Sequence, residues 1–253
     1  MGQDQTPFFL VGCVRSGTTL LRDLLRQHDR LECPEETHFF RWADPFGTDR
    51  FRRTYKKSEL MKRHREMDGV ANFDFSYIMN NSQNRWQMSA GYGLAYLKAQ
   101  GNPEGRWFDK TPQNVYGVLL ISAAFPNAKY IHIHRHPLNV VASLLEGAVM
   151  PPHGLNGAIN YWTEAVSILQ QFRKVAGDRL IDIRYDDLTS APLDTLHRLL
   201  GFLDEDPTLL RAELGNIHLE KNKYLEKLDD GQVRKVLEQT AEGRDILGYG
   251  DTP

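Results

Sequence analysis

Cysteine is scarce in this sequence, because its 253 residues include only Cys13 and Cys33. Two cysteines are too few for a disulfide framework, and their spacing matches no zinc-binding pattern. The sequence therefore excludes the class of small domains that disulfides hold together. It favours a reducing compartment.

Long apolar segments and an excess of charge of one sign are also missing. The apolar run from Phe8 to Val11 is much shorter than a signal-peptide core, and no run approaches the roughly 18 to 20 apolar residues of a membrane span. The 31 Lys and Arg against 33 Asp and Glu leave a net charge of −2, which argues against coating nucleic acid or membrane by bulk charge. We therefore expect a cytoplasmic protein with no membrane span and no nucleic acid partner, in which any anion site is local. The sequence carries no signal for the oligomeric state.

Three short β-type runs are present, at 8–11, 130–134 and 180–185, and apolar residues at helical spacing follow each of them. Strands that alternate with helices are typical of a parallel sheet with helices on both faces. The polar segment 41–105 interrupts this alternation and is rich in aromatic residues. The sequence therefore predicts a single α/β domain over residues 1–253, with three layers, a central parallel sheet and a helical insertion.

A glycine-containing loop, Gly12 to Thr19, joins the first predicted strand to the first predicted helix. Backbone N–H groups of such a loop and of a helix N-terminus can surround a phosphate. The glycine spacing is that of the GxxxxGK[ST] nucleotide loop, but Thr18 stands at the lysine position, so the group that would reach a β- or γ-phosphate is absent. The loop thus disfavours an ATP-dependent kinase. Arg15 and the hydroxyls of Ser16, Thr18 and Thr19 suit a single terminal phosphate.

A second candidate anion site follows the second predicted strand. Arg135 stands at the end of that strand, and Ser143 lies two turns into the next predicted helix. The two side chains can converge on one phosphate, to which the arginine supplies charge-assisted hydrogen bonds. Two separate anion sites imply a ligand with two phosphates.

Both motifs resemble those of the sulfotransferases that use 3′-phosphoadenosine 5′-phosphosulfate (PAPS). Residues 12–21, GCVRSGTTLL, are similar to the 5′-phosphosulfate loop of that family, and residues 131–143, IHIHRHPLNVVAS, to its 3′-phosphate motif. Two further segments are similar to family segments, WFDKTP at 107–112 and RYDDL at 184–188. The resemblance implies a P-loop-like fold, PAPS as co-substrate, adenosine 3′,5′-bisphosphate (PAP) as the released product, and no metal ion.

The resemblance also implies which residues hold the nucleotide. The family's glycine-rich C-terminal cofactor loop is not legible in this sequence, and Lys223, or alternatively Lys221, stands where a basic residue would close over the 3′-phosphate. The implied cofactor-binding residues are Arg15, Ser16, Gly17, Thr18, Thr19, Arg135, Ser143, Tyr185 and Lys223.

Two adjacent acids, Glu35 and Glu36, follow the first predicted helix in the segment CPEETHFF. A carboxylate within hydrogen-bond reach of an acceptor hydroxyl can serve as general base. This segment resembles the EET segment of the tyrosylprotein-type sulfotransferases, which implies Glu36 as the base. His38 is the competing candidate, because histidine titrates near neutrality. Alternatively, the two acids cap a helix or face solvent.

In-line transfer of a sulfuryl group leaves negative charge on the bridging oxygen of the departing 5′-phosphate. Cations aimed at that oxygen stabilise the transition state. Arg15 and Lys110 are the candidates, and Lys110 matches the lysine that precedes a proline in the family's KxP segment.

The sequence thus predicts a PAPS-dependent sulfotransferase that acts on a hydroxyl, or in second place an amine, of a small-molecule or saccharide acceptor. We expect the insertion at 41–105 to form the acceptor side of the site, because aromatic side chains can wall a pocket. Its basic run between residues 50 and 65 fits an acidic substrate and a solvated helix face equally well. Two alternatives stay open: a protein tyrosine as acceptor, and a nucleotide kinase-like phosphotransferase.

Overall fold

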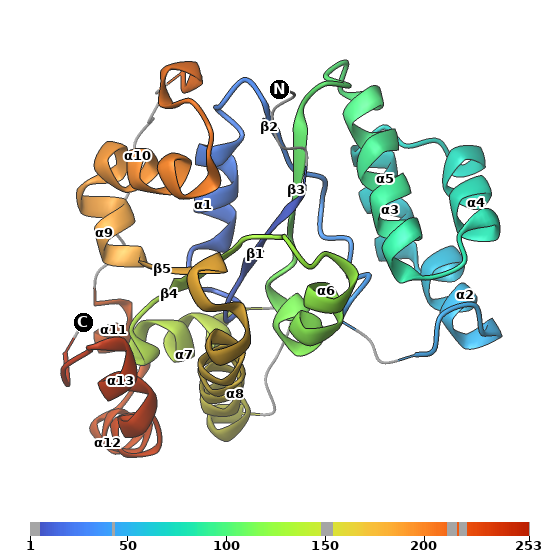
Figure 1. Cartoon of the computed structure of the whole chain (residues 1–253). Helices are drawn as coiled ribbons and strands as arrows, with labels where there is room; N and C mark the ends of the chain where they lie inside the picture. Colours follow the sequence, from blue (N-terminus) through green and yellow to red (C-terminus); the bar gives the residue numbers. More distant parts are fainter. Residues whose placement is uncertain (1–5, 42–43, 148–153, 212–216, 218–221, 253) are drawn as a thin grey trace.

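The computed structural model describes residues 6–41, 44–147, 154–211, 217 and 222–252. Within these residues, five parallel strands form one sheet in the order β2-β3-β1-β4-β5 (Figure 1). This arrangement confirms the predicted parallel α/β fold. The strands are β1 (Phe8–Val11), β2 (Leu31–Glu32), β3 (Arg106–Lys110), β4 (Tyr130–His134) and β5 (Leu180–Arg184).

Helices cover both faces of the sheet and extend beyond it at the C-terminal end of the chain (Figure 1). None of those in the described ranges is long and apolar enough to cross a membrane. The helices outside the insertion are α1 (Thr18–Leu25), α6 (Val118–Ala124), α7 (Pro137–Glu146), α8 (Gly154–Ala176), α9 (Tyr185–Ser190), α10 (Pro192–Leu203), α11 (Lys223–Lys227), α12 (Asp230–Gln239) and α13 (Ala241–Leu247).

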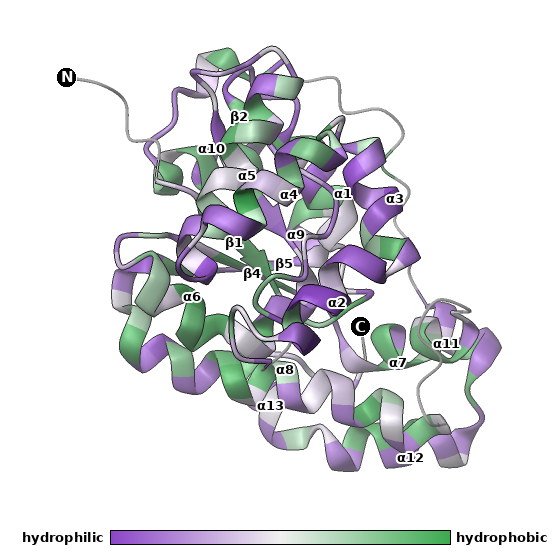
Figure 2. Cartoon of the chain, turned by 90° about the vertical axis from the view of Figure 1, so that its right-hand side faces the viewer, coloured by the Kyte–Doolittle hydropathy of each residue, from purple (hydrophilic) through white to green (hydrophobic). Residues whose placement is uncertain are grey.

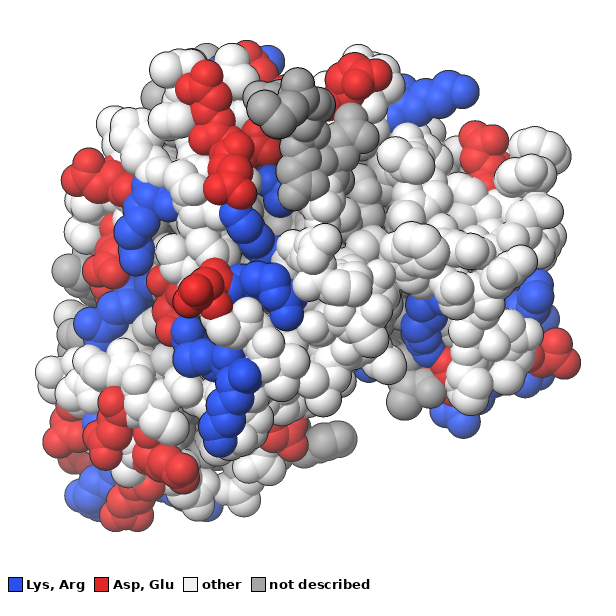
Figure 3. Space-filling view, in the orientation of Figure 1, with Lys and Arg blue, Asp and Glu red and all other residues white. Residues whose placement is uncertain are grey.

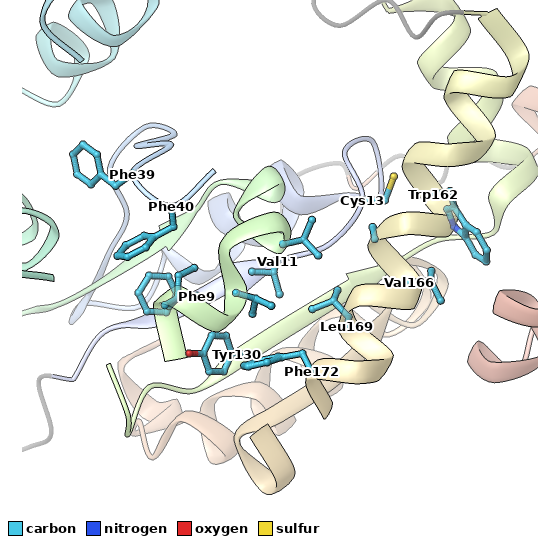
Figure 4. Close-up of a cluster of buried hydrophobic side chains, with 14 of the residues drawn as sticks. Phe9, Val11, Cys13, Phe39, Phe40, Tyr130, Trp162, Val166, Leu169 and Phe172 are labelled. Atoms are coloured by element: carbon cyan, nitrogen blue, oxygen red, sulfur yellow. The ribbon is translucent and has the colours of Figure 1, made fainter. Parts of the chain in front are cut away.

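The side chains of β1 show how the two faces are covered. Successive residues of a strand point to opposite faces. Phe8 and Leu10 belong to a buried cluster with the leucines of α1 and α10, whereas Phe9 and Val11 belong to a second cluster with α8. Figure 4 shows Phe9 and Val11 in this second cluster, together with labelled side chains of α8. The strand is therefore buried on both faces, as the continuous apolar run in the sequence requires.

The predicted helical insertion is present between β2 and β3. Its helices are α2 (Asp49–Lys57), α3 (Glu59–Met67), α4 (Asn72–Asn81) and α5 (Arg85–Ala99). Figure 2 shows hydrophilic residues along α2 and α3. Tyr55, Phe75 and Tyr92 are buried and belong to the same cluster as Phe9 of the sheet. The insertion therefore shares its core with the α/β unit.

The sequence pattern did not predict β2 and β3. In β3 the residues Arg106, Asp109 and Lys110 interrupt the apolar pattern, although all five of its residues are buried. The Arg106 guanidinium is neutralised inside the protein, because it donates to the Leu203 carbonyl (2.7 Å) and to Glu205 (3.1 Å). A smaller correction concerns the run at 180–185, which ends as a strand at Arg184, since the next residue already begins α9.

Candidate functional site

The predicted phosphate loop leaves β1 and enters α1 at Thr18. Both of its glycines have positive φ, 152° at Gly12 and 95° at Gly17, and both are required by close contacts. A Cβ atom at Gly12 would lie 2.4 Å from the Ile133 carbonyl oxygen, and one at Gly17 would lie 2.4 Å from the ring of Tyr185. The loop therefore lies directly against β4 and the start of α9, which carry other predicted motifs.

A cavity of about 190 Å³ opens beside this loop. It brings together seven of the predicted cofactor-binding residues and adds Leu20, which the sequence analysis did not name. Ser16 lies in the same loop, and its buried hydroxyl has no hydrogen-bond partner within the described part of the chain. A ligand phosphate would satisfy that hydroxyl. The lining residues are Arg15, Gly17, Thr18, Thr19, Leu20, Arg135, Ser143 and Tyr185.

A hydrogen bond joins the two predicted anion motifs. Arg15 Nε donates to Ser143 Oγ over 2.9 Å, although the two residues are 128 positions apart in the sequence. Arg15 belongs to the loop after β1, and Ser143 belongs to α7. The side chain of Arg15 thus lies beside the residue predicted for the 3′-phosphate.

Arg135 follows β4 directly and is buried. Its guanidinium carbon lies 4.2 Å from the centroid of the Tyr185 ring, and its carbonyl accepts a hydrogen bond from Trp162 Nε1 (3.0 Å). Stacking on an aromatic face orients a guanidinium while leaving its N–H edges able to bind anions. The pair therefore presents a fixed cation to the cavity.

The candidate catalytic side chains form a second group. Lys110 Nζ lies 2.7 Å from Glu36 Oε1, and His38 Nε2 lies 3.6 Å from Glu36 Oε2. Lys110 and His38 are buried, whereas the Glu36 side chain is 29% exposed. Burial lowers the pKa of His38 to about 3, and the charge of Arg41 adds to this effect. His38 is therefore neutral near pH 7, and Glu36 is the carboxylate that solvent or an acceptor can reach.

Asp109, next to Lys110 on β3, is a buried carboxyl group to which the sequence analysis gave no role. It accepts hydrogen bonds from the Thr37 hydroxyl and from Asn114 Nδ2, the latter over 3.1 Å. Burial raises the pKa of Asp109 to about 6. Asp109 thus links the segment around Glu36 to the central sheet.

The charge on the surface is mixed. Figure 3 shows Lys and Arg side chains interspersed with Asp and Glu on the face drawn there. Arg15 and Arg135, the cations predicted to bind anions, both line the cavity beside the phosphate loop. In the described residues, no three His, Cys, Asp or Glu side chains come together in a way that could hold a metal ion. The absence of a metal cofactor stays a prediction.

Comparison with known proteins identifies the family. The model of the sulfotransferase family matches residues 7–208, which include all the motifs described above except the C-terminal lysine. The chain belongs to the sulfotransferase family. Its fold is the P-loop-like fold of solved sulfotransferase structures, and membership of this family disfavours the nucleotide kinase alternative.

Two relatives and one solved structure illustrate the similarity. The sequence is 28% identical to protein-tyrosine sulfotransferase A of Caenorhabditis elegans over 205 residues, which are 79% of this chain and 50% of that protein. It is 26% identical to the omega-hydroxy-beta-dihydromenaquinone-9 sulfotransferase Stf3 of Mycobacterium bovis, with 78% of this chain and 62% of that protein covered. The chain spans about half the length of the curated relatives it matches. The sulfotransferase domain of the Synechococcus PCC 7002 olefin synthase has the same fold, with a TM-score of 0.64, 23% identity, and 99% of this chain and 98% of that chain covered.

The predicted C-terminal lysine of this sulfotransferase is not among the residues that line the cavity. Lys223 Nζ lies 2.6 Å from Glu146 Oε2, at the end of α7, and Lys227 binds the same carboxylate. Lys221, the alternative, lies outside the described residues. The ion pair with Glu146 is therefore the contact that the structure gives Lys223.

The C-terminal segment of this sulfotransferase holds both neighbours of Arg135, a contact that the sequence analysis did not predict. His134 Nδ1 and the Tyr249 hydroxyl are 2.8 Å apart, and His136 Nε2 donates to the Gly250 carbonyl over 3.0 Å. Burial lowers the pKa of His134 to about 3 and also lowers that of His136. No local sequence signal could have revealed these two contacts, because more than 100 residues separate the partners.

Proposed function

We propose that this sulfotransferase moves a sulfuryl group from PAPS to a hydroxyl group of its acceptor, with Glu36 as the general base. One observation carries the proposal: a single cavity combines the glycine loop, Arg135, Ser143 and Tyr185, and the Arg15–Ser143 hydrogen bond joins its two anion motifs. A nucleotide with one 3′-phosphate and one 5′-phosphosulfate matches two anion motifs that share one cavity.

The residues of the cavity divide between the two ends of the nucleotide. Arg135 and Ser143 would hold the 3′-phosphate, with Tyr185 beside the nucleotide. The loop N–H groups and the hydroxyls of Ser16, Thr18 and Thr19 would hold the 5′ end. Arg15 belongs to the loop by its backbone and contacts Ser143 by its side chain, so it can serve either end.

The transfer itself needs a base on the acceptor side and a cation on the leaving-group side. The Glu36 carboxylate accepts the proton of the acceptor hydroxyl while the hydroxyl oxygen bonds to sulfur. The bond between sulfur and the bridging oxygen breaks, and its electron pair stays on the 5′-phosphate of the departing PAP. Lys110 stabilises that negative charge. The 2.7 Å contact between Lys110 and Glu36 supports a shared reaction centre, because both side chains can then reach one transferring group.

For the acceptor we propose a hydroxyl of a small molecule or saccharide, with the insertion at 41–105 as the acceptor side. A protein tyrosine is the second candidate, because several similar proteins, including the one from Caenorhabditis elegans, are protein-tyrosine sulfotransferases. Incubating the protein with PAPS and three matched panels of acceptors, namely tyrosine peptides, saccharides and hydroxylated lipids, separates these candidates. Mass spectrometry would detect one added sulfuryl group in one panel. Sulfation of tyrosine peptides alone would overturn the small-molecule assignment.

The nucleotide site can be tested without knowing the acceptor. Calorimetry should show that PAP binds much more tightly than AMP, which lacks the 3′-phosphate. Arg135→Ala should weaken PAP about ten- to a hundredfold, the equivalent of about 1.5 to 3 kcal/mol for one charge-assisted contact, and leave AMP nearly unchanged. Equal affinity of the unmutated protein for both nucleotides would refute the proposed 3′-phosphate site.

A further inference from the structure

The segment that carries Glu36 has no regular secondary structure between Cys33 and Phe39. Its backbone N–H and C=O groups therefore lack the partners that a helix or a strand would supply. Buried backbone groups in such a segment need other hydrogen-bond partners. Where these partners come from decides how firmly Glu36 is held.

Side chains supply these partners for five consecutive residues, and the insertion provides four of the five side chains. The fifth, Thr111, directly follows β3 of the sheet. The bonds run from Glu35 N–H to Asp68 Oδ1 (2.7 Å), from His64 Nδ1 to the Glu36 carbonyl (2.9 Å), from Thr37 N–H to Thr111 Oγ1 (3.0 Å), from the Tyr55 hydroxyl to the His38 carbonyl (2.8 Å) and from the Arg85 guanidinium to the Phe39 carbonyl.

Asp68 connects this segment to two helices of the insertion. It is buried at the C-terminal end of α3, and its second carboxylate oxygen accepts a hydrogen bond of 2.5 Å from the Tyr92 hydroxyl of α5. Its carbonyl accepts from Gln100 Nε2 over 3.0 Å. The Tyr92 ring in turn packs edge-on against Phe39, with ring centroids 5.3 Å apart. A displacement of Asp68 would therefore disturb the segment both at Glu35, which binds Asp68 directly, and at Phe39, which packs against Tyr92.

Tyr55 holds the segment where its backbone is strained. His38 has a φ of 54°, in the left-handed region that residues other than glycine rarely adopt. Such a conformation persists only when its surroundings fix it. The buried Tyr55 hydroxyl binds the carbonyl of this very residue, two positions after Glu36.

We propose that Asp68 and Tyr55 are positioning residues, through which the insertion holds the Glu36 carboxylate against Lys110. The proposal rests on the proposed role of Glu36 as base. It gives the insertion a task beyond contacting the acceptor, because helices that do not line the nucleotide cavity then control the rate of transfer. A misplacement of a reacting group by about 1 Å can cost roughly a hundredfold in rate.

The test compares Asp68→Ala, Asp68→Asn and Tyr55→Phe with the unmutated protein and with Met79→Ala. Met79 is buried in α4 of the same insertion, and none of the hydrogen bonds described above involves it. Its truncation therefore controls for a loss of stability alone. The measurements are kcat and KM at saturating PAPS, PAP affinity by calorimetry, and hydrogen exchange of the 33–39 peptide.

Asp68→Ala should lower kcat about ten- to a hundredfold, speed exchange of the 33–39 peptide and leave PAP affinity within about twofold. Asp68→Asn should restore most of the rate, because its amide oxygen still accepts from the Glu35 N–H. Tyr55→Phe should lower kcat several-fold, and Met79→Ala should lower the melting temperature with kcat almost unchanged.

Glu36→Gln in the same assay separates the proposed role of Glu36 as base from the proposed positioning role of Asp68 and Tyr55. If Glu36→Gln is inactive while Asp68→Ala and Tyr55→Phe keep full kcat, the positioning proposal is overturned and the base stands. If Glu36→Gln keeps its rate, the base assignment fails, and the positioning proposal fails with it. Equal losses of kcat in Met79→Ala and Asp68→Ala would also overturn the proposal, because a general loss of stability would then explain the lower rate of Asp68→Ala.

Discussion

Replacing Glu36 with glutamine removes a charge and a proton acceptor but keeps the shape of the side chain. Loss of a general base typically costs 10²- to 10⁴-fold in rate, or about 3 to 5 kcal/mol of activation free energy. The substitution also takes the carboxylate away from the buried Lys110 ammonium, 2.7 Å distant. Removal of one partner of a fully buried pair costs about 3 to 5 kcal/mol of stability. We expect about 1 to 2 kcal/mol here, because Glu36 is 29% exposed and water screens the pair.

His38→Asn is the comparison that isolates the base. Its Nε2 lies 3.6 Å from the Glu36 carboxylate, and because burial lowers the pKa of His38 to about 3, the ring carries no charge near pH 7. Asparagine tolerates the left-handed φ of 54° at this position better than most residues. We therefore expect His38→Asn to lose less than about tenfold in turnover, far less than the loss typical of a general base.

The assay measures kcat with both PAPS and acceptor saturating, and calorimetry measures PAP affinity separately. A fall in kcat with nearly unchanged nucleotide binding supports the role of Glu36 as base. A rise in the acceptor KM alone would mean that Glu36 orients the hydroxyl without taking its proton. If Glu36→Gln keeps its rate and His38→Asn is inactive, the assignment of the base is reversed and the reasoning from the burial of His38 is refuted.

Three other predictions concern the loop, the C-terminal lysine and the buried acid. Gly17→Ala should abolish measurable PAP binding in calorimetry, because its Cβ would lie 2.4 Å from the Tyr185 ring and its φ of 95° is strained for alanine; an affinity within threefold of the unmutated protein would contradict this. Lys223→Ala should leave PAP affinity within about twofold, because the ammonium pairs with Glu146 instead; a tenfold loss would restore Lys223 to the nucleotide site. Burial raises the pKa of Asp109 to about 6, so the folded state binds a proton more tightly than the unfolded state and this group makes the protein less stable as pH rises from about 4 to about 6. Asp109→Asn should remove that part of the decline in melting temperatures measured across this range, and an unchanged slope would show that Asp109 does not cause it.

Much of the fold could be predicted because its signals are local. The strand at 8–11 is a continuous apolar run, as a sheet buried on both faces requires, and the strand at 130–134 is a short run with two β-branched isoleucines. The loop at 12–19 has its glycines where the chain must turn tightly. The strand β3 could not be predicted, because Arg106 and Asp109 are buried there with the distant partners Glu205 and Thr37. Charged residues at buried positions look like surface residues until those partners are known.

The candidate site divides in the same way. The sequence by itself determined which residue types stand in the phosphate loop, at Arg135 and Ser143 and in the EET segment, because each motif is short and keeps its spacing along the chain. Only the tertiary structure decided that Arg15 bonds to Ser143 and that Lys223 pairs with Glu146. It also decided that Asp68 and Tyr55 donate or accept the hydrogen bonds that hold the segment around Glu36. The physical reason is that an irregular segment such as 33–39 takes its shape from whichever side chains satisfy its backbone groups, and packing of the whole chain selects those side chains.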